Sequence, residues 1–499
     1  MNPEYPRKAP SPKFTLGRVP KPVATDDAEI PQASVLSTMA LLAGLFVTIS
    51  TVQGTVSSKI AAYMAWGVGF SLVVSILIDL HKGVRNLVRT DVMALCSLYF
   101  LTFFEFLTPQ TRFDQILAPP AVFAGGTACA WGFAGMAIGR HLTSTGRAHF
   151  ASLFERPVST AFIIKVYWFC LVAGYFYIFF SVNFNPIEVI SQCMDARFSQ
   201  AWSRGKFGDW KAVLGELGLL IYVIPAIAGV VLAKRDIYTK SQLAQVMIGF
   251  AFTLFYGFSG GTRNVFASYL VTFLIGFAFS LPRRKTMQLI VVSGVTACML
   301  LLAARVMIEF RTMGLRYYLS GEMKDALAEA ETEFFVDYNL YVICELTEVF
   351  PGRYHYMGWE IPYLAVIRPI PRALWPGKPE GMSLSIEEVL GAEGLTLASS
   401  FVGEAYVSYG FIGVFGVGLF FGAVFGWWSR LASPHNSDFG VLVYASGFFA
   451  AVISMRSLFV FTTAVLPTVG AIVIGQFFLN QKQHRELTVG RQRTRKVDP

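Results

Sequence analysis

Residues 283–308 read RRKTMQLIVVSGVTACMLLLAARVMI, and this stretch decides the fold class. It has no charged residue between Lys285 and Arg305, and a transmembrane helix needs about 20 mostly apolar residues. Three cations stand directly before the apolar run, which is typical of the cytoplasmic end of a span. We therefore predict a transmembrane helix over 286–308 that begins at the cytoplasmic side.

The composition of the whole chain agrees with this stretch. Of 499 residues, 54% are hydrophobic and 15% are charged, whereas about a quarter of the residues of a soluble protein are charged. The sequence predicts an all-α polytopic membrane protein with about 12 transmembrane helices, each about 20 residues long. The predicted spans are 34–53, 58–80, 91–108, 119–139, 159–182, 212–233, 242–259, 264–281, 286–308, 403–428, 438–455 and 459–479.

Loop charges predict the orientation of these spans. With the N-terminus in the cytoplasm, every predicted inner connection carries cations, whereas the early outer connections 54–57 and 109–118 are nearly neutral. This distribution places both termini in the cytoplasm and the long interval after the ninth span outside. The net charge of +9 lies largely in short loops and the tail, which indicates attraction to headgroups rather than binding of nucleic acid. The predicted organisation is a disordered cytoplasmic tail over 1–33 that is not a signal peptide, helices one to nine over 34–308, a long outer loop over 309–402, helices ten to twelve over 403–480, and a basic cytoplasmic tail over 481–499.

The outer loop contains the stretch RPIPRALWPGKP over residues 368–379, in which three cations alternate with four prolines. Proline fixes φ and disfavours regular helix or sheet, so the cations are expected on a stiff, irregular backbone. The guanidinium groups of Arg368 and Arg372 match pairs of phosphate oxygens, and Lys378 adds a point charge. The stretch predicts a site for a multiply charged anion; the alternative is a charge cluster that only anchors the loop at lipid headgroups.

Further candidate residues fall on the same predicted side. Residues 260–263, Gly-Gly-Thr-Arg, form a turn before the eighth span, and the free N–H groups at a helix start favour anions; the alternative is an ordinary tight turn. Arg305 lies inside the outer end of a span, where a charge either snorkels to the interface or faces a polar cavity. Arg311 and Arg316 follow it.

Glu404 stands in the first turn of the tenth predicted span. An acid there can complement the helix dipole, or it can orient or deprotonate a hydroxyl group of a substrate. Trp375 can stack on a sugar ring or belong to an interfacial aromatic belt. Arg456 lies at the outer turn between the last two spans.

The order of these features resembles the Wzy-type O-antigen polymerases, which are oligosaccharide repeat-unit polymerases of bacterial envelopes. The residues that carry the resemblance are 261–263 at the start of a span, 371–379 late in the outer loop, and 403–410 at the start of the next span. The overall plan covers about 34 to 480, whereas the specific motifs cover only some 50 residues.

The resemblance implies a polymerase in the bacterial inner membrane that joins undecaprenyl-diphosphate-linked oligosaccharides at the periplasmic face, without a metal or cofactor. Its expected partners are this lipid-linked substrate and membrane lipids, and a polysaccharide chain-length regulator is left open. Arg263, Arg372 and Glu404 are the candidate catalytic residues. The candidate substrate-binding residues are Arg368, Lys378, Arg305, Arg311, Arg316, Trp375, Tyr406 and Arg456.

Two other functions remain open. An O-antigen ligase uses the same type of donor, and sequence separates it poorly from a polymerase. A transporter or flippase of lipid-linked sugars would need carboxylates or broken helices at mid-bilayer, whereas Asp79, Glu105 and Glu216 all lie near predicted span edges. The cysteines lack metal-ligand spacing, and a disulfide between Cys193 and Cys344 in the predicted outer loops is left open.

Overall fold

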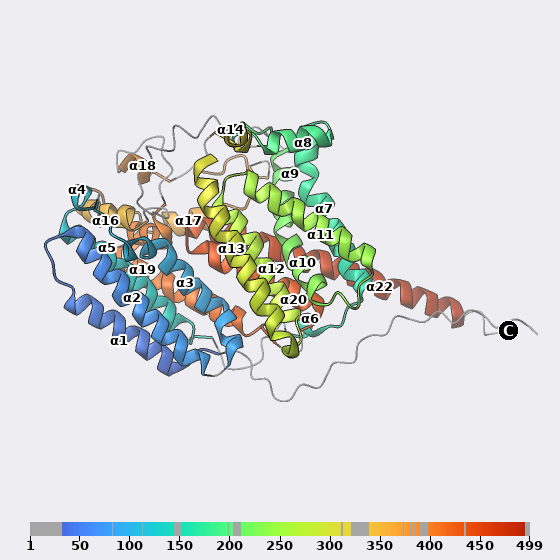
Figure 1. Ribbon diagram of the computed structural model, residues 1–499, viewed down its shortest axis with the longest axis horizontal. Coiled ribbons are helices and arrows are strands. Elements are labelled where there is room, and N and C mark those ends of the chain that lie inside the picture. The colour runs from blue at the N-terminus through green and yellow to red at the C-terminus, as the bar shows by residue number, and fades with distance from the viewer. Residues whose placement is uncertain are drawn as a thin grey trace, which may run out of the picture.

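The computed structural model describes residues 32–494, with gaps at 82, 112, 144–150, 198, 203–210, 311–312, 321–338, 373, 380–381, 384–385, 390–397 and 434–435. The described residues form helices and their connections and include no strand (Figure 1). The predicted all-α class is therefore confirmed. The predicted N-terminal tail lies outside the described residues as far as position 31.

In the described part of the chain, nine helices are long and apolar enough to cross a membrane. They are α2 (Ser57–Leu80), α5 (Pro119–Gly139), α7 (Thr160–Ser181), the run through α9 (Lys211–Leu217), η3 (Gly218–Val223) and α10 (Ile224–Ala233), α11 (Lys240–Ser259), α12 (Arg263–Ser280), α13 (Thr286–Phe310), α19 (Ser400–Ser429), and the run through α21 (Leu458–Ala464) and α22 (Leu466–Thr494). Three shorter apolar helices are α1 (Val35–Thr51), α3 (Thr90–Thr102) and α20 (Asp438–Ser454). Each predicted span coincides with one of these helices or runs. They fit a multi-pass membrane protein, while the count of twelve crossings and their orientation stay predictions.

Short helices occupy several connections, including the long predicted outer loop. The loop carries α14 (Leu315–Ser320), α16 (Asn339–Val349), α17 (Glu360–Ile367) and α18 (Ile386–Val389). The other short helices are α4 (Phe113–Ile116), α6 (Ala151–Glu155), α8 (Pro186–Cys193), η1 (Val84–Val88), η2 (Phe104–Leu107) and η4 (Arg283–Lys285). The predicted C-terminal tail begins as a continuation of α22. Cys193 and Cys344 are free and buried, so the structure does not support a disulfide between them.

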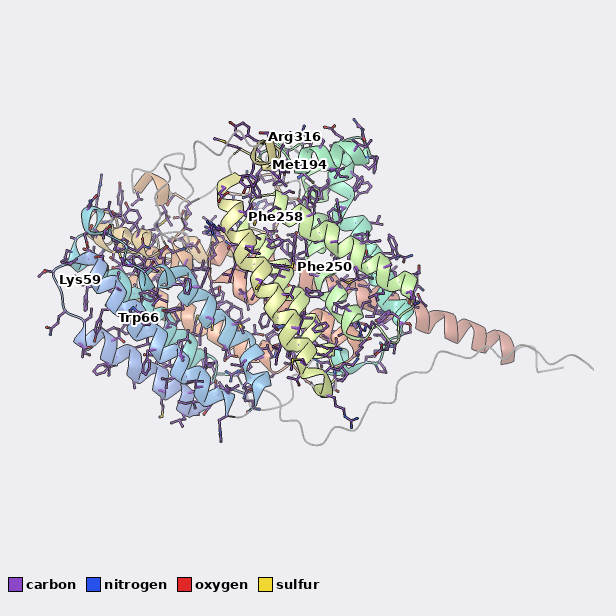
Figure 2. The ribbon with its side chains drawn as sticks, in the orientation of Figure 1. Lys59, Trp66, Met194, Phe250, Phe258 and Arg316 are labelled. Atoms are coloured by element: carbon purple, nitrogen blue, oxygen red, sulfur yellow. The ribbon has the colours of Figure 1, made fainter. Side chains whose placement is uncertain are left out.

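The apolar side chains form two main cores. One core joins α1, α2, α3, α5, α16 and α19, and the second joins α7, η3, α10, α11, α12 and α20. Figure 1 shows the first group on the left and the second on the right. Other large apolar side chains, such as Trp66 on α2, point outward (Figure 2), as expected for a surface that contacts lipid.

Glycines allow α5 and α19 to pack backbone against backbone. A Cβ atom at Gly422 would lie 2.3 Å from the carbonyl oxygen of Met136, and one at Gly135 would lie 2.5 Å from that of Phe415. Gly418, Gly422 and Gly426 recur every four residues and so share one face of α19. Small residues at such spacing are typical of closely packed helices in membranes.

A buried network of ion pairs lies at the C-terminal end of α19, next to Ser429. Arg89 binds Asp79 at 2.9 Å and also pairs with Asp91, and Arg140 lies 3.8 Å and 3.7 Å from the same two carboxylates. Ser429 at the end of α19 donates to Asp91 at 2.9 Å. The sequence placed Arg89 and Arg140 in inner connections, but both are almost fully buried, because the two aspartates balance their charges.

Candidate anion-binding site

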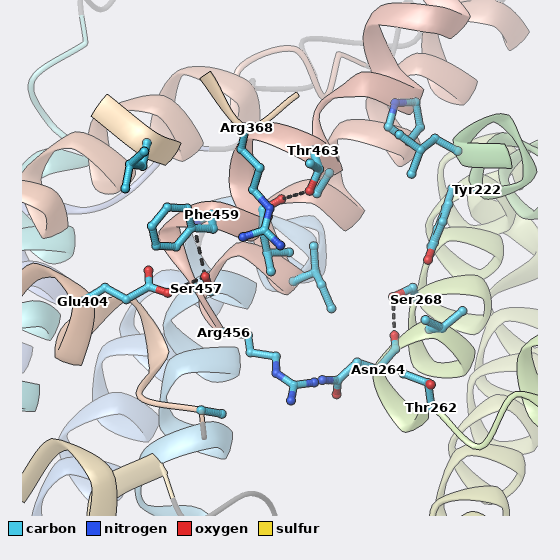
Figure 3. A pocket seen from close by; sticks show the side chains of 18 of the residues that line it. Tyr222, Thr262, Asn264, Ser268, Arg368, Glu404, Arg456, Ser457, Phe459 and Thr463 are labelled. Carbon is cyan, nitrogen blue, oxygen red and sulfur yellow. Dashed lines mark hydrogen bonds between the residues drawn. The ribbon is translucent and has the colours of Figure 1, made fainter. Parts of the chain in front are cut away.

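A cavity of about 960 Å³ lies where α12, α17, α19, α20, α21 and η3 meet (Figure 3). Among the described residues that line it, cations outnumber carboxylates by six to two. The carboxylates are Glu216 and Glu404, and the cations are Arg197, Arg263, Arg368, Arg372, Lys378 and Arg456. These cations come from four separate stretches of chain. Their convergence creates a region of positive potential that favours an anion.

The proline-rich stretch forms one wall and folds back on itself. The ammonium group of Lys378 donates to the carbonyl oxygens of Arg368 and Ile370, both at 2.8 Å. Arg372 donates to the carbonyl oxygen of Pro379 at 3.2 Å. These contacts hold the three cations on one compact loop, and the described residues within 369–379 are neither helix nor strand, as the prolines predict.

Lys378 is sensitive to the charge around it. Burial lowers the pKa of its ammonium group below the ordinary value, nearby Arg372 and Arg368 lower it further, and Glu216 opposes the shift. A bound anion would favour the charged form of Lys378 and reverse this change.

The side chain of Arg368 extends into the cavity between α17 and α21. Its guanidinium carbon lies 5.4 Å from the centre of the Phe459 ring, within the range of a cation–π interaction. Figure 3 shows Arg368 between Phe459 and Thr463, and shows Arg456 reaching toward Asn264 on α12. Two guanidinium groups therefore enter the cavity from different elements.

The start of α12 forms the opposite wall. Gly261 adopts a left-handed φ of +61°, which glycine accepts without strain. The chain then turns at Thr262, and α12 begins at Arg263. Asn264 and Ser268 also line the cavity. The positive end of the α12 dipole adds to the charge of Arg263 there.

Glu404 is 7% exposed and is held by the turn before α21. Its Oε1 atom accepts a hydrogen bond from the Ser457 hydroxyl at 2.5 Å, and its Oε2 atom accepts one from the Leu458 N–H at 2.5 Å. The Ser457 hydroxyl oxygen in turn accepts from the N–H of Phe459 at 3.1 Å and so caps α21. Glu404 therefore holds Ser457 and Leu458, which directly follow Arg456, in place. The sequence could not predict this contact, because Ser457 is 53 positions away.

Several predicted site residues lie elsewhere. Arg305 is exposed on α13, and Trp375, on the proline-rich loop, is not among the described residues that line the cavity. Arg316 pairs with Asp195 at 3.1 Å and donates to Ser191, which ties α14 to the end of α8, near Met194 (Figure 2).

Tyr406 is buried on another side of α19. Its ring contacts those of Tyr356 and Phe411, and its hydroxyl group donates to the carbonyl oxygen of Phe350 at 3.4 Å. A substrate role in this cavity is therefore not supported for Arg305, Arg316, Trp375 or Tyr406. The prediction for Arg311 lies outside the described residues.

Two charged lining residues were not predicted as site residues. Arg197 follows α8, and Glu216 lies in α9. The only signal for Arg197 was its presence in a charged outer loop, which does not reveal where a side chain points.

Comparison with known families gives one match. A family model described as a domain of unknown function (DUF8712) matches residues 307–482. This region contains Arg368, Arg372, Lys378, Glu404 and Arg456. Searches of curated proteins and of solved structures returned no match.

Proposed function

We propose that this chain is a membrane-embedded glycosyltransferase that joins lipid-diphosphate-linked oligosaccharide repeat units. The observation that carries the proposal is the convergence of six cations, from four stretches of chain, on one cavity. Guanidinium groups bind diphosphate oxygens through paired hydrogen bonds. Undecaprenyl diphosphate is the carrier that the resemblance to Wzy-type polymerases implies.

The proposed reaction needs only groups that the substrates and the chain supply. An acceptor hydroxyl oxygen attacks the anomeric carbon of the donor sugar and forms the new glycosidic bond. The bond from that carbon to the lipid diphosphate breaks, and its electron pair leaves with the diphosphate. The hydroxyl proton passes to a carboxylate or to water. Arg263, Arg368, Arg372 and Lys378 would stabilise the charge that develops on the leaving diphosphate.

The cavity also has an apolar wall that suits a lipid-linked donor. Leu219, Phe449, Ile453, Val460 and Ala464 also line the cavity. A hydrocarbon chain can lie against these side chains while its diphosphate meets the cations. A soluble nucleotide sugar has no hydrocarbon chain that could pack against these side chains.

Glu404 has two proposed roles. It can activate or orient the acceptor hydroxyl, as expected from the sequence. Its contacts with Ser457 and Leu458 favour a second role, in which it holds the Arg456 turn in place. The two roles differ in their effects on turnover.

The buried ion pairs favour a transferase over a transporter. A transporter of lipid-linked sugars must also open at the end of the bundle opposite its entrance. In this chain the part of α19 after its break at Tyr409 and Gly410 is about 28 Å long, at about 1.5 Å per residue, and the network around Asp91 closes its Ser429 end. Separating one buried ion pair costs about 3–5 kcal/mol. We further propose that the cavity faces the periplasm of the bacterial inner membrane and that both termini are cytoplasmic.

Reconstitution with a defined donor tests the proposal. Purified protein in liposomes would be incubated with lipid-linked repeat units, and the products separated by size. A ladder of multiples of the unit is expected. Transfer of a glycan only to added lipid A core would identify a ligase instead. Movement of intact substrate across the bilayer, with no new glycosidic bond, would refute a transferase.

A further inference from the structure

Helix α17 has two faces of opposite environment. Ile361, Leu364 and Ala365 are buried against the rest of the protein. The other face carries an apolar stripe that begins just before the helix at Trp359, which is 75% exposed, and continues to Val366, which is 70% exposed. The stripe consists of Trp359, Tyr363 and Val366, whose spacings of four and three residues place them on one side of the helix, and of Ile370 and Leu374, which follow in the proline-rich loop and are also exposed.

The stripe is attached to α19 at a break in that helix. Tyr409 and Gly410 leave the helical conformation, with φ of +61° at Gly410. Such a break frees carbonyl groups of the preceding turn. Two N–H groups of the segment before α17 bind freed carbonyls at 3.0 Å each, Met357 to Val407 and Gly358 to Ser408.

The exposed surface continues from the stripe onto a membrane-spanning helix. The ring of Trp359 packs against that of Tyr409, with centres 5.8 Å apart. Ile412, less than one turn further along α19, is 82% exposed. An isoleucine so exposed on a span is expected to contact lipid. The stripe on α17 and the lipid-facing side of α19 thus form one apolar surface.

The length of α19 gives the depth of this surface. After the break at Tyr409 and Gly410 the helix continues for 19 residues, to Ser429, or about 28 Å at about 1.5 Å per residue, which is close to the hydrocarbon thickness of about 30 Å. Counting about 20 residues back from Ser429 places the other edge of the hydrocarbon near Tyr409. Residues 400–408 are buried and fold back beside the later part of α19, where the Phe401 ring packs against that of Phe421 with centres 5.1 Å apart. Trp359 and Tyr363 lie at the level where aromatic belts occur.

We propose that the segment Trp359–Leu374 lies in the membrane interface, with its apolar stripe in contact with lipid of the outer leaflet. Helix α17 is then a thin wall between the bilayer and the cavity. Its lipid-facing side carries Val366, and Arg368 on its other side faces the cavity. The cations of the proline-rich loop therefore lie at the depth of the lipid phosphates. The proposal concerns the bilayer and is independent of the transfer reaction.

Photocrosslinking in liposomes tests this contact without using the native cysteines. Benzoylphenylalanine would replace Val366 or Leu374 in the full chain, reconstituted with radiolabelled phospholipid. Ile412 serves as the lipid-exposed control, and Arg353, which is exposed in the same loop outside the stripe, serves as the aqueous control. Lipid labelling at 366 and 374 should approach that at 412 and exceed that at 353 several-fold.

Two results would overturn the proposal. Labelling at 366 and 374 no higher than at 353 would mean that the stripe faces water. A crosslink to a second copy of the chain or to another protein, in place of lipid, would mean that protein covers the stripe. A lipid adduct would support contact with the bilayer even if no polymer ladder were found, so each of the two proposals can be refuted without the other.

Discussion

Replacing Glu404 by Gln distinguishes the two roles proposed for this residue. The side chain accepts two charge-assisted hydrogen bonds, from the Ser457 hydroxyl and the Leu458 N–H. Such a bond contributes about 1.5–3 kcal/mol and a neutral one about 0.5–1.5 kcal/mol, so the substitution weakens the pair by about 2 kcal/mol. If this energy holds the Arg456 turn in place, kcat/KM falls roughly thirtyfold.

Ser457→Ala is the matched variant. It removes one of the two charge-assisted bonds and leaves the carboxylate in place, so a positioning role predicts a fall in kcat/KM of roughly thirtyfold, equivalent to about 2 kcal/mol. A general base predicts a different pattern: Glu404→Gln would lower kcat by about 10²–10⁴, and Ser457→Ala would leave it nearly unchanged.

The assay measures initial rates of ladder formation against donor concentration and pH. For a positioning residue, both variants raise KM for the donor, and both keep the wild-type pH profile. The positioning role is refuted if Ser457→Ala is normal while Glu404→Gln loses turnover alone and also loses the acid limb of the profile.

Three further predictions concern the cavity wall and the helix seam. Arg372→Ala should lower polymer lengthening by about 10²–10³ and leave membrane insertion intact; normal ladders would remove Arg372 from the site. Lys378 should lose its charge at a lower pH than an ordinary lysine, because its pKa is lowered. Donor affinity should therefore fall as the pH rises through the pKa of Lys378, and Lys378→Arg should move this fall to higher pH. Identical pH profiles for the wild type and the variant would show that the ammonium group does not bind the donor. Gly422→Ala would bring a methyl group within 2.3 Å of a backbone oxygen of α5 and should destabilise the protein by about 1–3 kcal/mol, measured as a lower melting temperature in detergent. Gly416→Ala, which meets nothing within 4 Å, is its control, and equal melting temperatures would contradict close packing at the seam.

The helices could be predicted from sequence because an apolar run of sufficient length forms a helix in lipid regardless of its neighbours. Each predicted span coincides with an observed apolar helix or run. The helices within the outer loop were not predicted, since α16 and α17 are short and their buried faces depend on contacts with α5, α19 and α21. Short elements of this kind are stabilised by tertiary packing rather than by their own propensity.

The cavity could be predicted in part. Arg263, Arg368 and Arg456 were assigned to the same side from loop charges, and they line one cavity. Loop charge identifies the end of a helix at which a residue lies but not the direction of its side chain. Arg305 and Arg316 were therefore included although they point elsewhere, and Arg197 was omitted.

The four-charge network bears on how the chain is made. Asp79, Arg89, Asp91 and Arg140 all belong to the first 140 residues, so their charges cancel before α19 has been synthesised. These two aspartates and two arginines therefore balance one another within the N-terminal helices. Ser429, which is synthesised later, adds a hydrogen bond to this network and no charge.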